Sequence, residues 1–97
     1  MAHTLLFEIW EEPASNSFEM SPVTEAGDQM RSTIAPTSVL RHSFRAKSDF
    51  EAHQMNHDWQ GWASWKPEPG WTEHLFTAEE AAVQEQYLAV RRVRYSP

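Results

Sequence analysis

Two stretches of the chain, residues 4–12 and residues 39–46, alternate apolar and polar side chains with the two-residue period of a β-strand. Residues 17–21 resume this pattern after a turn-forming Pro-Ala-Ser-Asn sequence, so residues 4–21 are expected to form a β-hairpin. The third strand is expected to pair antiparallel with one member of the hairpin, because purely parallel sheets need both faces covered. The side chains predicted to form the apolar core face of this sheet are Leu5, Phe7, Ile9, Leu40 and Phe44.

Three segments carry the signals that start a helix. Thr24, Ser48 and Thr77 each offer a hydroxyl oxygen that can accept a hydrogen bond from an N–H group of a first helical turn. Ser48 and Thr77 are also followed three residues later by a glutamate, as in a capping box. The helices are expected over residues 25–34, 49–60 and 78–93, and Gly61 is placed to end the second of them in the left-handed conformation. The third helix has a narrow apolar stripe, formed by Val83, Tyr87 and Val90.

These elements predict an α+β fold. We expect an antiparallel sheet of about three strands with two short helices on one face, then an irregular aromatic strap and a C-terminal helix. A chain of 97 residues is long enough for one domain and too short for two. Residues 1–76 are expected to form this small α+β domain including the strap, and residues 77–97 the C-terminal helix and tail.

Composition excludes several classes of function. The chain has no cysteine, which excludes disulfides, thiolate metal sites and cysteine nucleophiles and fits a cytoplasmic location. Its net charge of −6 repels a phosphate backbone, so general nucleic-acid binding is not expected. No apolar run approaches the ~20 residues of a membrane span, so no membrane association is expected either.

The order of the elements ends in Gly61-Trp62 followed by Lys66-Pro67. In this the chain resembles a family of small uncharacterised bacterial proteins whose shared part closes with Gly-Trp and a nearby Lys-Pro or Arg-Pro. The resemblance covers residues 4–67. Because that family has no assigned activity, the resemblance implies a fold and no catalytic residue.

The most unusual feature of the sequence is the aromatic segment, residues 59–76, in which Trp62, Trp65 and Trp71 stand among prolines and glycines. The segment has two interpretations: a strap that crosses one sheet face and completes a small core, or an arm that docks a partner. Burial of a large apolar side chain contributes at least ~2 kcal/mol, which favours the strap. We therefore predict that Trp62 is the most buried of the three tryptophans and Trp71 the most exposed.

Two histidines form the second candidate site. His53 and His57 are four residues apart on a predicted helix, so their imidazoles project from one face and could chelate a divalent metal. Asp58 or His42 is the available third ligand. The catalytic zinc-protease signature requires a glutamate directly after the first histidine, and Gln54 stands there instead.

The leading hypothesis is a small non-catalytic protein-interaction module of bacterial type, with another protein or a second copy of this chain as its partner and no cofactor. The alternative is a domain that binds a metal or a small ligand through His53 and His57. An enzyme is a third class, and no catalytic motif in the sequence supports it. The residues assigned to partner binding are Trp62, Trp65 and Trp71.

Overall fold

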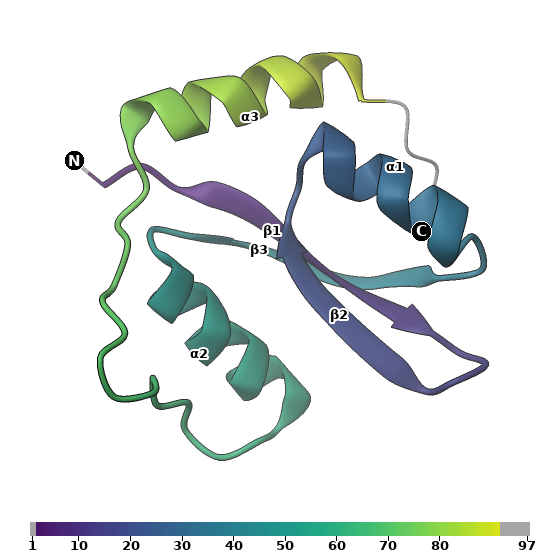
Figure 1. Ribbon diagram of the computed structural model, residues 1–97, viewed down its shortest axis with the longest axis horizontal. Coiled ribbons are helices and arrows are strands. Elements are labelled where there is room, and N and C mark those ends of the chain that lie inside the picture. The colour runs from purple at the N-terminus through teal and green to yellow at the C-terminus, as the bar shows by residue number, and fades with distance from the viewer. Residues whose placement is uncertain (1, 92–97) are drawn as a thin grey trace.

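A three-stranded antiparallel sheet organises the molecule. The computed structural model describes residues 2–91, and its strands are β1 (Leu5–Glu12), β2 (Ser17–Pro22) and β3 (Val39–Ala46). Their order is β2-β1-β3, so β1 is the central strand and pairs antiparallel with both neighbours (Figure 1). The predicted hairpin and third strand are confirmed.

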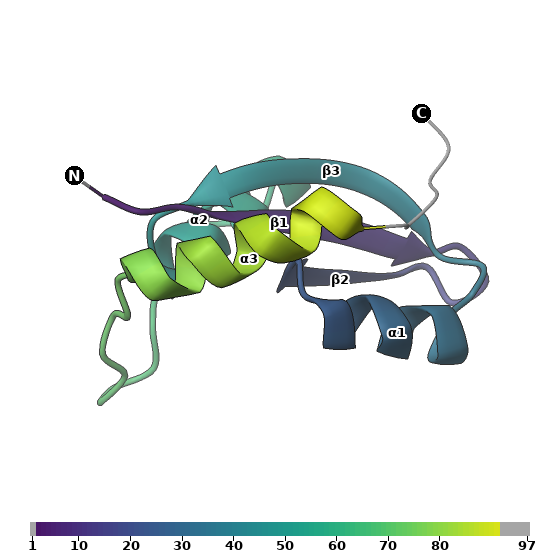
Figure 2. The same ribbon diagram turned by 90° about the horizontal axis from the view of Figure 1, so that it is seen from above.

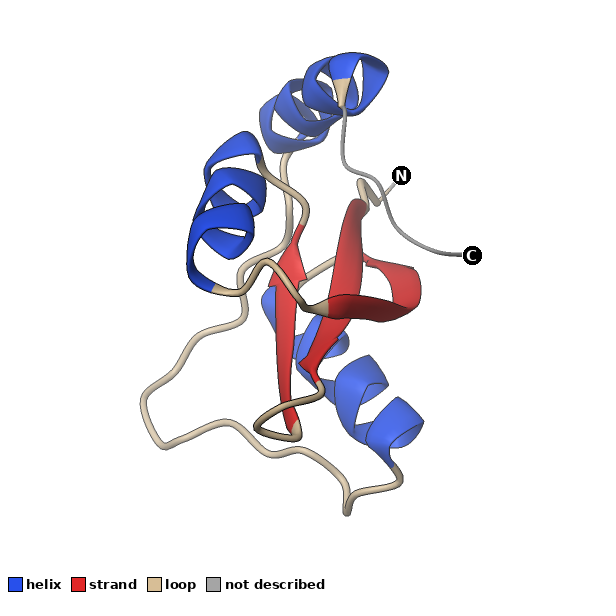
Figure 3. Cartoon of the chain, turned by 90° about the vertical axis from the view of Figure 1, so that its right-hand side faces the viewer, coloured by secondary structure: helices blue, strands red, loops and turns tan. Residues whose placement is uncertain are grey.

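Three helices complete the predicted α+β fold: α1 (Glu25–Ile34), α2 (Asp49–Gln60) and α3 (Ala78–Val90). Figure 3 shows α1 and α3 on one side of the strands and α2 on the other. The two helices that share a face are therefore α1 and α3, and not the first two along the chain as expected. β2 and β3 run parallel to each other, so the chain crosses over β1 through α1 on one face and turns into α2 on the opposite face. Residues 92 and 93, into which the pattern extended the third helix, lie outside the described residues.

The main apolar core lies between the sheet and α2. The Phe7 and Phe44 rings stack across β1 and β3 with their centroids 5.6 Å apart, and Phe76 packs against Phe7 at 5.9 Å. Four of the five side chains predicted for the core face are confirmed. The buried members of this cluster are Leu5, Phe7, Ile9, Phe44, Ala46 and Ala52.

The prediction that Leu40 belongs to the core face is wrong. A β-bulge in β3 pairs His42 with Ile9 but Leu40 with Trp10, so Arg41 is an extra residue in the strand. Strand partners project from the same side of a sheet, so Leu40 lies with Trp10, on the face opposite Ile9. Leu40 is only half-buried there. The two-residue period does not continue through the bulge, and the sequence pattern did not reveal it.

The opposite face of β1 is also covered, although its side chains are polar or aromatic. Glu8 and Trp10 are both buried, with exposed fractions of 3% and 6%. α3 is held to β1 by Gln84, whose amide oxygen accepts a hydrogen bond from the Leu6 N–H at 2.7 Å. The same amide donates to the carbonyl oxygens of Leu6 and Val23. A buried glutamine thus fixes the first half of α3 to the backbone of the sheet.

The C-terminal end of α3 is fixed by charges. The Arg91 guanidinium donates two hydrogen bonds to the Glu8 carboxylate, at 2.6 and 2.9 Å, and two to Asp28 of α1, at 2.8 and 3.0 Å. Arg31 also pairs with Asp28, and its guanidinium lies 3.8 Å above the Trp10 ring. Two arginines therefore neutralise two carboxylates whose side chains are less than a tenth exposed. We call these two arginines and two carboxylates, together with Trp10, the Arg91 network.

The contacts of the Arg91 network shift the pKa values of Asp28 and of Tyr87, which is hydrogen-bonded to it. Burial raises the pKa of Asp28, but hydrogen bonds from Arg91, Tyr87 and Arg31 outweigh burial and hold that pKa below its ordinary value. The Tyr87 hydroxyl donates a hydrogen bond to the Asp28 carboxylate. Burial and this carboxylate together raise the pKa of Tyr87 to about 12. Asp28 is therefore charged, and Tyr87 neutral, at neutral pH.

The helix ends follow the sequence signals. Thr24 and Thr77 accept hydrogen bonds from the third helical N–H of α1 and α3, and Thr77 forms a full capping box with Glu80. Gly61 ends α2 with a φ of 77°, in the left-handed region. Its N–H bonds to the Asp58 carbonyl, so the chain leaves the helix sharply at this residue.

Ser48 caps α2 and also holds the segment that follows the helix. Its hydroxyl oxygen accepts from the Glu51 N–H at 3.0 Å, and the hydroxyl donates to the Glu73 carboxylate. Glu51 reaches back to the Lys47 N–H, one residue before the cap. Ser48 is fully buried, so the hydroxyl joins two parts of the chain that are 25 residues apart.

Replacing Ser48 with alanine is expected to lower the free energy of unfolding by about 1–3 kcal/mol, because the Glu51 N–H and the Glu73 carboxylate both lose a partner. Urea unfolding of both proteins measures the difference. Ser43→Ala is the matched control, because Ser43 is an exposed strand residue. Equal midpoints and slopes for Ser48→Ala and the wild type would contradict the cap.

Replacing Arg91 with glutamine is expected to lower the free energy of unfolding by about 3–5 kcal/mol, because two buried carboxylates lose their main partner. Arg45→Gln is the matched control. Its exposed ion pair with Glu85 is worth at most about 1 kcal/mol.

Repeating these melts at falling pH tests the same contact. The pKa of folded Asp28 is depressed, so its stabilisation is complete above the ordinary value of 3.8 and is lost as pH falls through the folded value. The wild type should lose more stability below pH ~4 than Arg91→Gln does. A parallel acid response in both proteins would contradict the role of Arg91.

Candidate functional site

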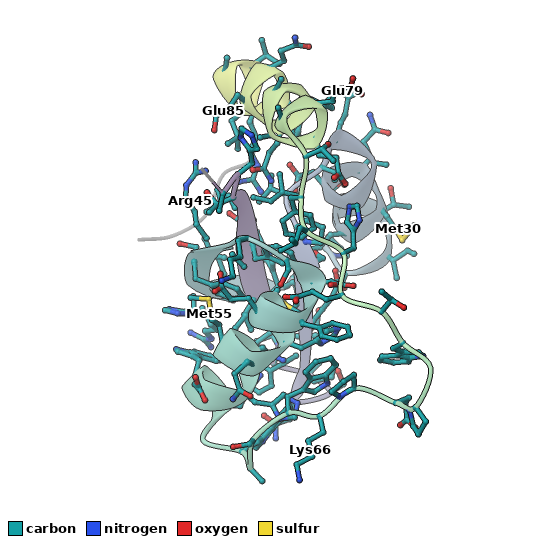
Figure 4. All side chains as sticks on the ribbon, turned by 90° about the vertical axis from the view of Figure 1, so that its left-hand side faces the viewer. Met30, Arg45, Met55, Lys66, Glu79 and Glu85 are labelled. Carbon is teal, nitrogen blue, oxygen red and sulfur yellow. The ribbon has the colours of Figure 1, made fainter. Side chains whose placement is uncertain are left out.

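The aromatic segment does not cross the sheet. It leaves α2 at Gly61, runs along the outside of that helix and reaches the core again at Phe76 (Figure 1). Figure 4 shows its ring side chains gathered beside α2, with Lys66 pointing outward at the lower end. We use the name aromatic surface for the tryptophans of α2 and of this segment, which are Trp59, Trp62, Trp65 and Trp71.

Trp65 is the fixed centre of the aromatic surface. Its indole stacks on the His53 ring with centroids 4.7 Å apart and meets the Phe50 ring edge-on at 5.1 Å. Its backbone N–H donates to the side-chain oxygen of Gln54 at 3.2 Å. α2 therefore holds Trp65 half-buried against one flank, and Trp71 packs beside it with the indole centroids 6.5 Å apart.

Trp62 and Trp71 are largely exposed, with exposed fractions of 55% and 57%. The prediction that Trp62 is the most buried of the three is wrong, because Trp65 is the less exposed residue; Trp71 is the most exposed, as predicted. The left-handed turn at Gly61 causes this difference. It lets the Trp62 N–H bond to the His57 carbonyl at 2.9 Å, which leaves the indole at the end of the helix with one edge-on contact to the His57 ring.

Trp59 extends the aromatic surface toward the sheet. Its indole stacks on His42 of β3 at 5.3 Å and meets Phe18 of β2 edge-on at 6.0 Å. The helical spacing places Ala52, Met55 and Trp59 on one stripe of α2. Ala52 is buried and Met55 is half-buried, but 38% of Trp59 is exposed. The contributions of Phe18 and His42 were not evident from the sequence, because they depend on how the sheet edge meets the end of α2.

The two histidines of α2 are engaged with the aromatic segment. His53 stacks on Trp65, and the Nδ1 atom of His57 lies 2.9 Å from the Ala63 carbonyl oxygen, to which it can donate. Within residues 2–91, no group of three histidine, aspartate or glutamate side chains is arranged to hold a metal ion, so neither His42 nor Asp58 completes such a site. In this part of the chain, the alternative metal function therefore has no third ligand beside the two histidines.

Comparisons with protein-family models, curated proteins and solved structures gave no match to this chain. The resemblance to a small bacterial family stays a prediction. None of the helices in residues 2–91 has the length and apolarity needed to cross a membrane. What the chain does must be inferred from its own residues.

The exposure of these indoles predicts the quenching of tryptophan fluorescence by acrylamide. Trp62→Phe and Trp71→Phe should each lower the quenchable fraction, because each removes a ring that water reaches. Trp10→Phe is the matched control and should raise that fraction, because Trp10 is buried. If Trp62→Phe left the quenchable fraction unchanged while Trp65→Phe lowered it, the arrangement of the aromatic surface would be contradicted.

Proposed function

We propose that this chain is a small non-catalytic protein-interaction module and that the aromatic surface binds its protein partner. The observation that carries this proposal is the exposure of Trp62 and Trp71, each more than half open to solvent beside the anchored ring of Trp65. Tryptophan is enriched among the residues that dominate the energy of protein interfaces.

The segment that carries these tryptophans is fixed at several points, which supports a binding role. The Trp71 N–H bonds to the Glu68 carbonyl at 3.1 Å in a turn that uses the positive φ of Gly70, 92°. The His74 N–H donates to the Asp49 carboxylate at 2.9 Å. Since the backbone is already ordered, a partner loses less conformational entropy on docking than it would against a loose arm.

Polar groups near the aromatic surface serve structural contacts, which supports a non-catalytic role. The Glu73 carboxylate accepts from the Ser48 hydroxyl, and His57 contacts the Ala63 carbonyl. His74 bonds to Glu80, whose pKa is lowered chiefly by the Thr77 N–H and also by this histidine. These side chains position the segment and α3.

The sequence around the tryptophans suggests the chemistry of the partner. Asp58, Glu68 and Glu73 lie in this part of the chain, and Lys66 is the basic residue among them. A partner surface that presents aliphatic or proline side chains together with arginine or lysine matches it, because an indole face attracts a cation as well as apolar groups.

The test is to immobilise the chain and compare what it retains from a native extract with what the variant Trp62→Ala, Trp71→Ala retains. Both tryptophans are exposed, so the variant should fold like the wild type, which circular dichroism can check. We expect the double variant to lose the retained protein. With that protein purified, each single substitution should weaken binding at least about tenfold, as for an interface hot spot.

The control is Glu85→Gln, which changes an exposed residue of α3 and leaves the aromatic surface intact. It should retain the same protein with unchanged affinity. Equal retention by the wild type and the double tryptophan variant would refute the assignment of the aromatic surface as the partner site.

A further inference from the structure

Two of the three residues in the apolar stripe of α3 are exposed. Val83 and Val90 are 66% and 64% exposed, although they were the most apolar positions of the predicted stripe. The polar side chains of Gln84 and Arg91 fix α3 to the rest of the molecule instead. A helix docked by its polar side leaves its apolar side available for another contact.

This apolar side forms one wall of a groove. The other wall is the end of β2 with the start of α1, and the volume between the walls is about 780 Å³. Figure 2 shows α3 drawn over β1, with the end of β2 next to α1. The apolar residues that line the groove are Leu5, Pro22, Val23, Phe76, Val83, Tyr87 and Val90.

The groove continues along α1. A second hollow of about 290 Å³ shares Pro22 and Thr24 with the first, and its lining includes Met30 and Ile34, which are 62% and 74% exposed. Figure 4 shows Met30 of α1 and Glu79 of α3 projecting to the same side of the molecule. Apolar surface of this extent, rimmed by polar residues, is typical of an interaction site.

The charged residues along both hollows are mostly acidic: Glu25, Glu79 and Glu80 line the first, and Glu19 lines the second. The basic residue in these linings, Arg31, is paired with Asp28. An occupant must therefore bring apolar groups for the floor and positive charges for the rim.

We propose that this groove binds a basic amphipathic helix of a protein partner. Such a helix places apolar side chains at i, i+3, i+4 and i+7 into the groove, and its lysines and arginines meet the four glutamates. A second copy of this chain fits less well, because a symmetric contact would bring two acidic rims together in a chain of net charge −6. None of the tryptophans of the aromatic surface is among the residues that line either hollow, so this site shares no side chain with the aromatic surface.

The probe is a fluorescein-labelled peptide of about 18 residues, or five helical turns, with leucines on one face and lysines on the other. Fluorescence anisotropy measures its binding to the full chain. A peptide of the same composition in scrambled order, and one with glutamate in place of lysine, are the peptide controls. The basic amphipathic peptide should bind at least about tenfold more tightly than either, and added salt should weaken its binding.

Substitutions separate groove binding from simple charge attraction. Val83→Glu adds a negative charge at an exposed position. General electrostatic attraction would then make a basic peptide bind more tightly. Our proposal predicts the opposite, at least about tenfold weaker binding, because the variant disrupts the apolar wall of the groove. Glu79→Gln should weaken binding and reduce its salt dependence. Glu80 is left intact because it caps α3. The matched controls are Glu85→Gln, outside the groove, and Trp62→Ala, on the aromatic surface, and both should bind as the wild type does.

Three results would overturn the proposal. The first is equal affinity for the amphipathic and the scrambled peptide, and the second is unchanged or tighter binding by Val83→Glu. The third is that no peptide binds and that sedimentation shows a dimer which Val83→Glu abolishes. A second copy of the chain would then be the occupant of the groove. None of these results bears on the aromatic surface, whose test is the loss of retained protein by the double tryptophan variant.

Discussion

The buried guanidinium of Arg91 fixes the arrangement of one whole side of the molecule. Burying charges is unfavourable unless each is paired and hydrogen-bonded. Here Arg91 and Arg31 balance Glu8 and Asp28, so sheet, α1 and α3 meet in a neutral network. The geometry of that network leaves little freedom in how α3 can lie. Because α3 turns Gln84 and Arg91 inward, its valines face outward, and the groove is a direct result of the way the helix is anchored.

The sheet therefore has two differently built sides. Against α2 it buries an apolar cluster of ordinary kind, which supplies the hydrophobic stabilisation of a small domain. Against α1 and α3 it buries polar groups that specify position. The aromatic surface lies beside α2, whereas the groove lies along α3 and α1, and no side chain belongs to both.

The sequence predicts those features of the fold that depend on neighbouring residues. The caps at Thr24, Ser48 and Thr77 and the turn at Gly61 follow from local hydrogen bonds, and the strands follow from their alternation. Contacts between distant residues were missed: Glu8 lies on the polar face of a strand, and its partner is 83 residues further along the chain. The tryptophans could be identified as unusual, but their exposure depends on the direction in which the chain leaves Gly61.

The long separations within the Arg91 network have a consequence for biosynthesis. Every buried member of the α2-side cluster has been made once the ribosome has passed Ala52, so that side of the sheet can begin to close on a nascent chain. The ion pairs of Glu8 and Asp28 with Arg91 cannot form until Arg91 has been synthesised, 83 and 63 residues after these carboxylates. Non-local contacts of this kind form late in folding, since closing a long loop costs entropy before any contact offsets it. A chain that stops short of Arg91 lacks the guanidinium that joins Glu8 to Asp28, so the sheet, α1 and α3 are not yet locked together by charge.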